Sequence, residues 1–321
     1  MAVGRDHGGG LDDAAGRYGG ARGEWIDLST GINPVPYPIP ELTPEIWQAL
    51  PDRGALARLT SAARCHWSVP EGADLLALPG LSAVIPRLPA LAPPGPVAIP
   101  GPTYNEYTPA FARAGWDVQD RDPAPGDSGL VIVSPNNPTG RWHIAPPRSI
   151  GLRVIDESFC DTAPERSLIA EATQPGTLIL KGLGKFWGLA GLRLGFAIGD
   201  PALIAELRIA FGPWSISGPA LAIGATALDD PGWAEATRAR LNADAARLDR
   251  LMNATGAELA GGTSLFRLYT LPDTLPDAAT LQDQLAQQRI WTRVFPWSPR
   301  HIRLGLPAPG DWARLTDALA G

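Results

Sequence analysis

The stretch "TLILKGLGKFWGLAGLRLGFAIGD", residues 177–200, decides the fold, because it reads as two buried strands joined by a glycine-rich loop that carries a pair of lysines. Lys181 and Lys185 are the only lysines, so the 27 Lys+Arg less these two leave 25 arginines. Arginine cannot lose its proton, whereas a lysine amine in a suitable pocket can, and it then attacks a carbonyl carbon. We therefore predict a nucleophilic lysine here; the alternative is a pair of ordinary solvated lysines.

The composition is that of a globular protein with a substantial core. Hydrophobic residues make up 45% and charged residues 19% of 321 residues, which is enough for one large domain or two of ordinary size. A net charge of −6 argues against nucleic acid or an anionic membrane as the main partner. We therefore expect a small-molecule ligand, no nucleic acid and no membrane.

The N-terminus and the cysteines predict a cytoplasmic protein. Residues 1–16 lack the apolar core of a signal peptide, and no uncharged run is long enough to span a bilayer. Cys65 and Cys160, the only cysteines, lie far apart outside any CxxC, as expected of structural thiols in a reducing compartment. The four histidines lack ligand spacing, so no metal site is predicted.

Short apolar runs that end in glycine, proline or a polar residue recur between residues 74 and 200. We predict strands in "DLLALPG", "PVAIPGPTY", "GLVIVSPNNPTG", "LRVIDESF", "TLILKGLGK" and "LRLGFAIGD". Helix-like stretches at 81–92 and 105–116 lie between some of them, which predicts an α/β fold with a mostly parallel sheet. In such sheets ligands gather beyond the carboxyl ends of the strands.

From about residue 226 the pattern becomes that of a smaller α+β domain. A long amphipathic helix at 231–256 precedes the strand-like "LFRLYT", a helix around "TLQDQLAQQR" and the strand-like "HIRLGLP". We assign residues 35–225 to a large cofactor-binding domain. Residues 1–34 and 226–321 then form the small domain, in which the N-terminal segment caps the substrate.

Four motifs in order resemble a known family. They are "SPNNPTG", "VIDESF", "GKFWGLAGLRLGF" and "HIRLGLP". With them the chain resembles, over essentially its whole length, the class I/II aminotransferases of the fold-type I pyridoxal-phosphate enzymes. The resemblance implies a mostly parallel seven-stranded sheet, pyridoxal 5'-phosphate as cofactor and a homodimer.

The resemblance also implies how the cofactor ring is held. Lys185, three residues before Gly188, matches the lysine that binds the cofactor covalently, and Asp156 matches the carboxylate that pairs with the protonated ring nitrogen. Asn137 matches the asparagine that hydrogen-bonds the ring hydroxyl. Tyr104 matches the aromatic residue that stacks on the ring; a core tyrosine is its alternative interpretation.

The cofactor's phosphate needs backbone donors and positive charge. Gly80, Leu81 and Ser82 lie between a predicted strand and a predicted helix, whose first amides can bind a phosphate. Arg193, eight residues after Lys185, matches the arginine that closes this site.

Three features depart from the family's pattern. Gly182 and Gly184 stand where serine or threonine commonly holds the phosphate, which implies weaker phosphate binding. Phe159 replaces a tyrosine that bonds the ring hydroxyl, and Leu50 replaces the tyrosine by which many members reach the neighbouring subunit's phosphate.

The N-terminal "HGGG" and "INP" resemble the threonine-phosphate decarboxylase branch of the family, the cobalamin-biosynthesis relatives of histidinol-phosphate aminotransferase. This resemblance makes His7 and Asn33 candidate substrate contacts; a tail and an ordinary turn are the alternatives. Arg303 matches the arginine that binds the substrate carboxylate, and Arg293 stands where relatives with phosphorylated substrates carry another. Arg300 is predicted to be a surface residue.

The resemblance thus implies decarboxylation of O-phospho-threonine to an aminopropanol phosphate for cobalamin biosynthesis. The alternative is a histidinol-phosphate-type aminotransferase, because the two reactions differ only in which bond of the substrate is held perpendicular to the ring. A non-catalytic ligand sensor is a third hypothesis, against which the presence of both Lys185 and Asp156 argues.

Overall fold

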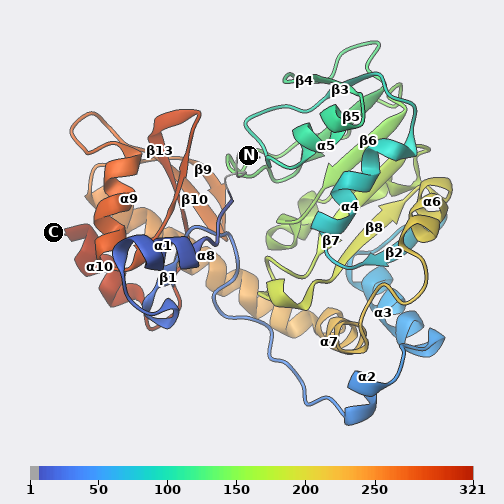
Figure 1. The fold of residues 1–321 in the computed structure, drawn as a ribbon, viewed down its shortest axis with the longest axis horizontal. Coiled ribbons are helices and arrows are strands. Elements are labelled where there is room, and N and C mark those ends of the chain that lie inside the picture. The colour runs from blue at the N-terminus through green and yellow to red at the C-terminus, as the bar shows by residue number, and fades with distance from the viewer. Residues whose placement is uncertain (1–6, 321) are drawn as a thin grey trace. The chain divides into compact units, whose positions relative to one another are not determined.

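The computed structural model describes residues 7–320, which form two compact units (Figure 1). The first unit holds the described residues up to Val35, the short segment Asn137–Arg141 and the described residues from Thr237 onward. The second unit comprises Pro36–Asn136 and Trp142–Ala236. The predicted boundaries at residues 35 and 225 remain a prediction.

The second unit is built on a seven-stranded sheet in the order β2-β8-β7-β6-β5-β3-β4. Its strands are β2 (Asp74–Leu78), β3 (Pro96–Ala98), β4 (Asp117–Gln119), β5 (Gly129–Val133), β6 (Leu152–Asp156), β7 (Thr177–Gly182) and β8 (Gly195–Gly199). β8 runs in the direction opposite to the other six strands of this sheet, so the predicted mostly parallel sheet is confirmed. The carboxyl ends of β5, β6 and β7 therefore meet at one edge of the sheet.

All six predicted strands of this sheet are present, and burial explains why their sequences are so apolar. Every residue of β5, β6 and β8 is buried, as expected of strands covered on both faces. The sequence did not predict β4, which is three residues long and lies at the edge of the sheet.

The second unit also contains helices. They are α2 (Pro44–Gln48), α3 (Arg53–His66), α4 (Leu81–Val84), α5 (Tyr107–Arg113), α6 (Pro201–Phe211) and α7 (Gly218–Leu228). The helix predicted at 81–92 differs from expectation, because α4 is a single α-helical turn that continues as a 3₁₀-helix over Ile85–Leu91. Pro86 and Pro89 have no N–H to donate, which prevents a regular α-helix there.

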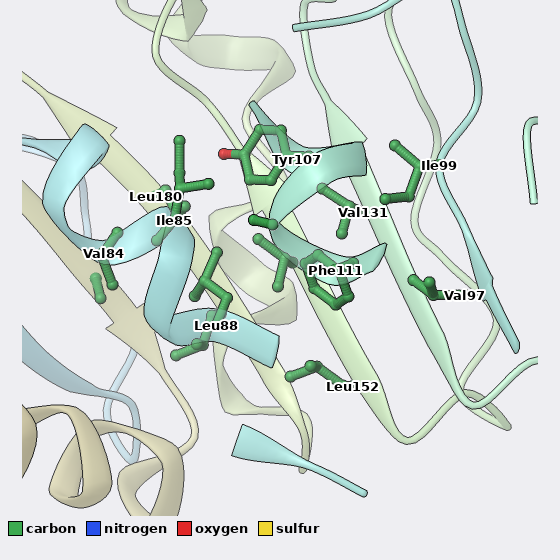
Figure 2. Packing of buried hydrophobic residues seen from close by; sticks show 14 of the residues in the cluster. Val84, Ile85, Leu88, Val97, Ile99, Tyr107, Phe111, Val131, Leu152 and Leu180 are labelled. Atoms are coloured by element: carbon green, nitrogen blue, oxygen red, sulfur yellow. The ribbon is translucent and has the colours of Figure 1, made fainter. Parts of the chain in front are cut away.

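The core of the second unit lies between α5, the α4 region and the sheet. Figure 2 shows Tyr107 and Phe111 of α5 over the strands that carry Val131 and Leu152, with Leu88 beside them. Burying an aromatic side chain of this size contributes roughly 1.5–3 kcal/mol. These contacts hold α5 firmly on the sheet near the carboxyl end of β6.

The first unit contains a four-stranded antiparallel sheet in the order β12-β13-β10-β9 and a small parallel pair, β1 with β11. Its strands are β1 (Ile26–Asp27), β9 (Glu258–Thr263), β10 (Phe266–Thr270), β11 (Ile290–Trp291), β12 (Arg293–Phe295) and β13 (Ser298–Gly305). Its helices are α1 (Leu11–Tyr18), α9 (Ala278–Gln287), α10 (Trp312–Ala320) and most of α8 (Pro231–Ala254). The four elements predicted after residue 226 are confirmed.

None of the helices in residues 7–320 is both long enough and apolar enough to cross a membrane.

Candidate functional site

The carboxylate of Asp156 stands at the carboxyl end of β6 and is almost fully buried. Its Oδ1 accepts hydrogen bonds from the backbone N of Ser158 at 2.8 Å and from the Ser158 hydroxyl at 2.5 Å. Its Oδ2 accepts one from the Tyr107 hydroxyl at 2.6 Å. Burial raises the pKa of Asp156, while these hydrogen bonds and the charge of Lys185 act in the opposite direction.

Lys185 lies in the loop between β7 and β8, on the same side of the sheet as Asp156. Its Nζ is 5.6 Å from the centre of the Phe159 ring, and its positive charge acts to lower the pKa of Asp156, against the larger effect of burial. The structure therefore brings together the predicted nucleophile and the predicted carboxylate within one unit.

Lys181, the other lysine, has a different environment. It is 2% exposed, and its Nζ lies 2.6 Å from a Glu157 carboxylate oxygen and 4.0 Å from one of Asp161. Burial alone would lower the pKa of Lys181, but the neighbouring negative charges outweigh it and raise the pKa. Neither lysine of the pair is an ordinary solvated residue on this geometry, and Lys181 is held as a cation in a buried ion pair.

The residues predicted to bind the phosphate lie where β2 is followed by α4. Arg193 donates from Nη2 to the Ser82 hydroxyl at 2.7 Å. Gly80, at φ +81°, has no Cβ, and a Cβ there would stand 2.7 Å from the same Nη2. The site therefore requires glycine at this position. Because α4 is one turn long, its amides add less than a longer helix would.

Tyr104 is partly buried next to α5. Its ring meets the Tyr107 ring edge-on, with centres 6.1 Å apart and planes at 78°. Tyr107 thus contacts both the predicted ring partner Asp156 and the predicted stacking residue.

In the first unit, Asn137 and Arg303 are hydrogen-bonded to each other. Nη1 of Arg303 donates to Oδ1 of Asn137, and its Nη2 donates to the carbonyl of Ser29. The turn that presents Asn137 requires Gly140, at φ +73°, because a Cβ there would lie 2.2 Å from the carbonyl oxygen of Gly262. Asn137, which is predicted to contact the cofactor, is therefore hydrogen-bonded to Arg303, which is predicted to contact the substrate.

Arg293 on β12 stands directly opposite Arg303 on β13 in the antiparallel register. Like charges opposite each other destabilise a sheet. Arg303 is 5% exposed, its Nε is buried without a hydrogen-bond partner, and its burial and the charge of Arg293 lower its pKa. Within residues 7–320, the hydrogen-bond partners of Arg303 are neutral. The pair is thus suited to an anion that bears more than one negative charge.

The three remaining residues singled out in the sequence are His7, Asn33 and Arg300. His7 is exposed at the start of the described chain. The buried Asn33 accepts from Arg240 at 2.6 Å and from the backbone N of Val35 at 3.0 Å, so its side-chain oxygen has a structural role. Arg300 is partly exposed, as expected of a surface residue, and its guanidinium donates to carbonyls of the loop at residues 271–275.

Sequence reasoning missed several residues that the site uses. Ser158 follows Asp156 by two positions, a spacing at which a hydroxyl commonly bonds an aspartate, so it could have been found. Tyr107 follows Tyr104 by three positions at the start of a helix, which is a weaker signal. Asp161 gave no signal in the sequence. Its two carboxylate oxygens accept hydrogen bonds from the indole N–H groups of Trp67 at 2.9 Å and Trp187 at 3.0 Å.

Among residues 7–320 no group of His, Cys, Asp and Glu could hold a metal ion.

The fold and this site define a class of enzyme, and comparison with known proteins agrees. Residues 25–320 match the family model "Aminotransferase class I and II", and the chain belongs to this family, whose cofactor is pyridoxal phosphate. It is 42% identical to a threonine-phosphate decarboxylase of Sinorhizobium sp, over 98% of this chain and 97% of that protein.

Two further comparisons extend this result. A threonine-phosphate decarboxylase of Pseudomonas aeruginosa is 38% identical over the same shares of the two chains. The structure of histidinol-phosphate aminotransferase from Sinorhizobium meliloti in complex with pyridoxal-5'-phosphate superimposes with a TM-score of 0.80 at 17% identity, covering 99% of this chain and 95% of that one. At that identity, the likeness supports the fold alone.

Proposed function

We propose that this chain is a pyridoxal-phosphate-dependent decarboxylase of O-phospho-threonine, which yields an aminopropanol phosphate for cobalamin biosynthesis. The observation that carries the proposal is the opposed pair Arg293 and Arg303, which places two positive charges side by side in one sheet, with Arg303 donating to two neutral oxygens. A phosphorylated amino acid supplies both a carboxylate and a phosphate. Full-length relatives at 42% and 38% identity that are threonine-phosphate decarboxylases support the same substrate.

The second unit fits the cofactor. An ionised carboxylate has about four acceptor sites, and Ser158 and Tyr107 use three of those on Asp156. One remains on Oδ2 for a single N–H donor such as a protonated ring nitrogen. When bound, the cofactor supplies an electron sink for the electrons of a broken Cα bond.

We assign separate roles to the lysine and to the residues around the cofactor phosphate. Lys185 would hold the cofactor through its amine, and the same amine, when free, would carry a proton to or from Cα of the substrate. Arg193, with Ser82 and the backbone at Gly80 and Leu81, holds the cofactor phosphate.

Substrate is held by the arginines. Arg303 binds the carboxylate and Arg293 the phosphate, with His7 and the amide nitrogen of Asn33 as further contacts. Because Arg303 donates to Oδ1 of Asn137, the amide nitrogen of Asn137 would be the group that donates to the cofactor's ring hydroxyl. Placement of the carboxylate relative to the ring selects which Cα bond breaks.

We further propose that the protein is a cytoplasmic homodimer. Both cysteines are free thiols, as expected of a reducing compartment. Large apolar side chains are exposed along one stretch of the second unit, Ile39, Trp47, Leu50 and Leu56, with Trp47 at 68%. Such a stretch is typical of a protein interface, and analytical ultracentrifugation tests it.

One experiment separates the two candidate reactions. The cofactor-loaded protein is incubated with O-phospho-threonine, and separately with histidinol phosphate and 2-oxoglutarate. Release of carbon dioxide in the first supports the proposal. Formation of glutamate in the second, without carbon dioxide in the first, would replace it with the aminotransferase.

A further inference from the structure

We infer that Tyr107 is a positioning residue of the cofactor site, whose hydroxyl donates to Asp156 and fixes the orientation of the carboxylate that would meet the cofactor's ring nitrogen. The inference rests on the proposed function, because it assigns Asp156 to that nitrogen. Nothing in the family motifs of this chain marks Tyr107.

The hydrogen bonds of Asp156 leave little freedom to the carboxylate. Oδ1 accepts hydrogen bonds from the N–H and the hydroxyl of Ser158, which lies two residues further along the chain. Oδ2 receives its bond from a different element, since Tyr107 is the first residue of α5. Because the two oxygens are fixed from two sides, rotation of the carboxylate would break at least one bond.

Tyr107 is itself held rigidly. It is 0% exposed, and Figure 2 shows its ring packed with the core residues of α5 and the sheet, while its hydroxyl points away from Ile99 and Val131. A side chain that has no room to change rotamer holds its hydroxyl group, and so its hydrogen-bond donor, in one position. The edge-on contact with Tyr104 extends this constraint to the predicted stacking residue.

Three groups face Asp156: Tyr107 from α5, Ser158 from the segment after β6, and Lys185 from the loop after β7. Burial raises the pKa of Asp156, and each of these three groups opposes that effect. Burial and the charge of Asp156 also keep the pKa of Tyr107 well above its usual value, so the phenol remains a donor. Loss of the phenol would therefore raise the pKa of Asp156.

The consequence for the reaction concerns one proton. With Asp156 ionised, the proton that the two groups share lies on the ring nitrogen, where it strengthens the electron sink. Without the Tyr107 hydroxyl, the proton shifts toward the carboxylate. Turnover then slows while substrate binding, which depends on the arginines, is kept.

The test is Tyr107→Phe, which removes only the hydroxyl. In the cofactor-loaded protein without substrate, the visible absorbance is titrated with pH, and its acid-side midpoint should rise by about one pH unit. The variant's kcat on O-phospho-threonine should fall about tenfold with nearly unchanged KM.

Tyr269→Phe is the matched control. Tyr269 is also fully buried, and its hydroxyl also donates to a carboxylate, Asp249 at 2.7 Å, but it belongs to the first unit. Its loss should lower the unfolding temperature without moving the absorbance midpoint.

The outcomes separate the two proposals. An unmoved midpoint in Tyr107→Phe, with a lower unfolding temperature alone, would make Tyr107 merely structural and overturn the inference. A shifted midpoint in a protein that does not decarboxylate O-phospho-threonine would uphold Tyr107 and reject the proposed substrate.

Discussion

Two buried cations in this molecule have opposite environments. Lys181, in the second unit, stands 2.6 Å from Glu157 and within 4.0 Å of Asp161, so its charge is balanced by carboxylates of its own chain. Arg303, in the first unit, donates to the amide oxygen of Asn137 and the carbonyl of Ser29 and has a second arginine opposite it in the sheet.

The difference separates a charge that is paired with carboxylates of its own chain from one whose hydrogen-bond partners are neutral. A buried charge that is paired with an opposite charge has little attraction left for a ligand. A buried charge without such a pair raises the free energy of the folded chain, and a bound anion would lower it. The same reasoning clarifies the lysine pair, because the carboxylates around Lys181 fix it as a cation and leave Lys185 as the candidate nucleophile.

The largest expected effect distinguishes the two lysines. Lys185→Arg should lower kcat/KM by on the order of 10⁴-fold or more, because a guanidinium cannot form the covalent bond to the cofactor. Lys181→Arg, which keeps a cation beside Glu157, should stay within about tenfold of wild type. After borohydride reduction, mass spectrometry should find the cofactor on residue 185; an adduct on residue 181 would reverse the assignment.

The next prediction compares Lys181 and Arg303 directly. Lys181→Met leaves Glu157 buried without its partner and should destabilise the protein by about 3–5 kcal/mol. Arg303→Met removes a charge whose hydrogen-bond partners are neutral, and it should change the free energy of unfolding by about 1 kcal/mol or less while substrate use falls sharply. Denaturant unfolding measures both. Equal destabilisation by the two substitutions would refute the contrast.

Arg293 tests which anion each arginine binds. A charge-assisted hydrogen bond contributes roughly 1.5–3 kcal/mol, so Arg293→Ala should lower kcat/KM for O-phospho-threonine by about one to two orders of magnitude. Threonine has no phosphate and cannot make that contact, so kcat/KM for threonine should fall much less. If both substrates are affected equally, Arg293 binds the shared carboxylate or is structural.

The smallest expected effect concerns the missing phosphate ligands. A Cβ at Gly182 would meet its nearest neighbours at 3.6–3.7 Å, an ordinary contact, so a side chain fits there. Gly182→Ser should tighten cofactor binding several-fold, as about 1 kcal/mol of added hydrogen bonding would. Gly182→Ala supplies the Cβ without the hydroxyl and is the control. Equal Kd values for the two variants would show that the hydroxyl does not reach the phosphate.

The sequence by itself determined the strands of the main sheet, the order of the motifs and the place of Lys185 and Asp156 at strand ends. These features are local: apolar runs bounded by glycine or a polar residue form buried strands wherever they occur. Even the failure at residues 81–92 has a local cause, because its prolines were visible and argue against an α-helix of that length.

The tertiary structure alone decided what surrounds each charge. The pairing of Arg293 with Arg303 depends on the register of β12 against β13, and the bond from Tyr107 to Asp156 depends on where α5 packs over the sheet. Lys181 acquires its partners because β6 and β7 are neighbours, which places Glu157 beside it. Register and packing arise from contacts between segments far apart in sequence, so no local pattern specifies which charges are balanced.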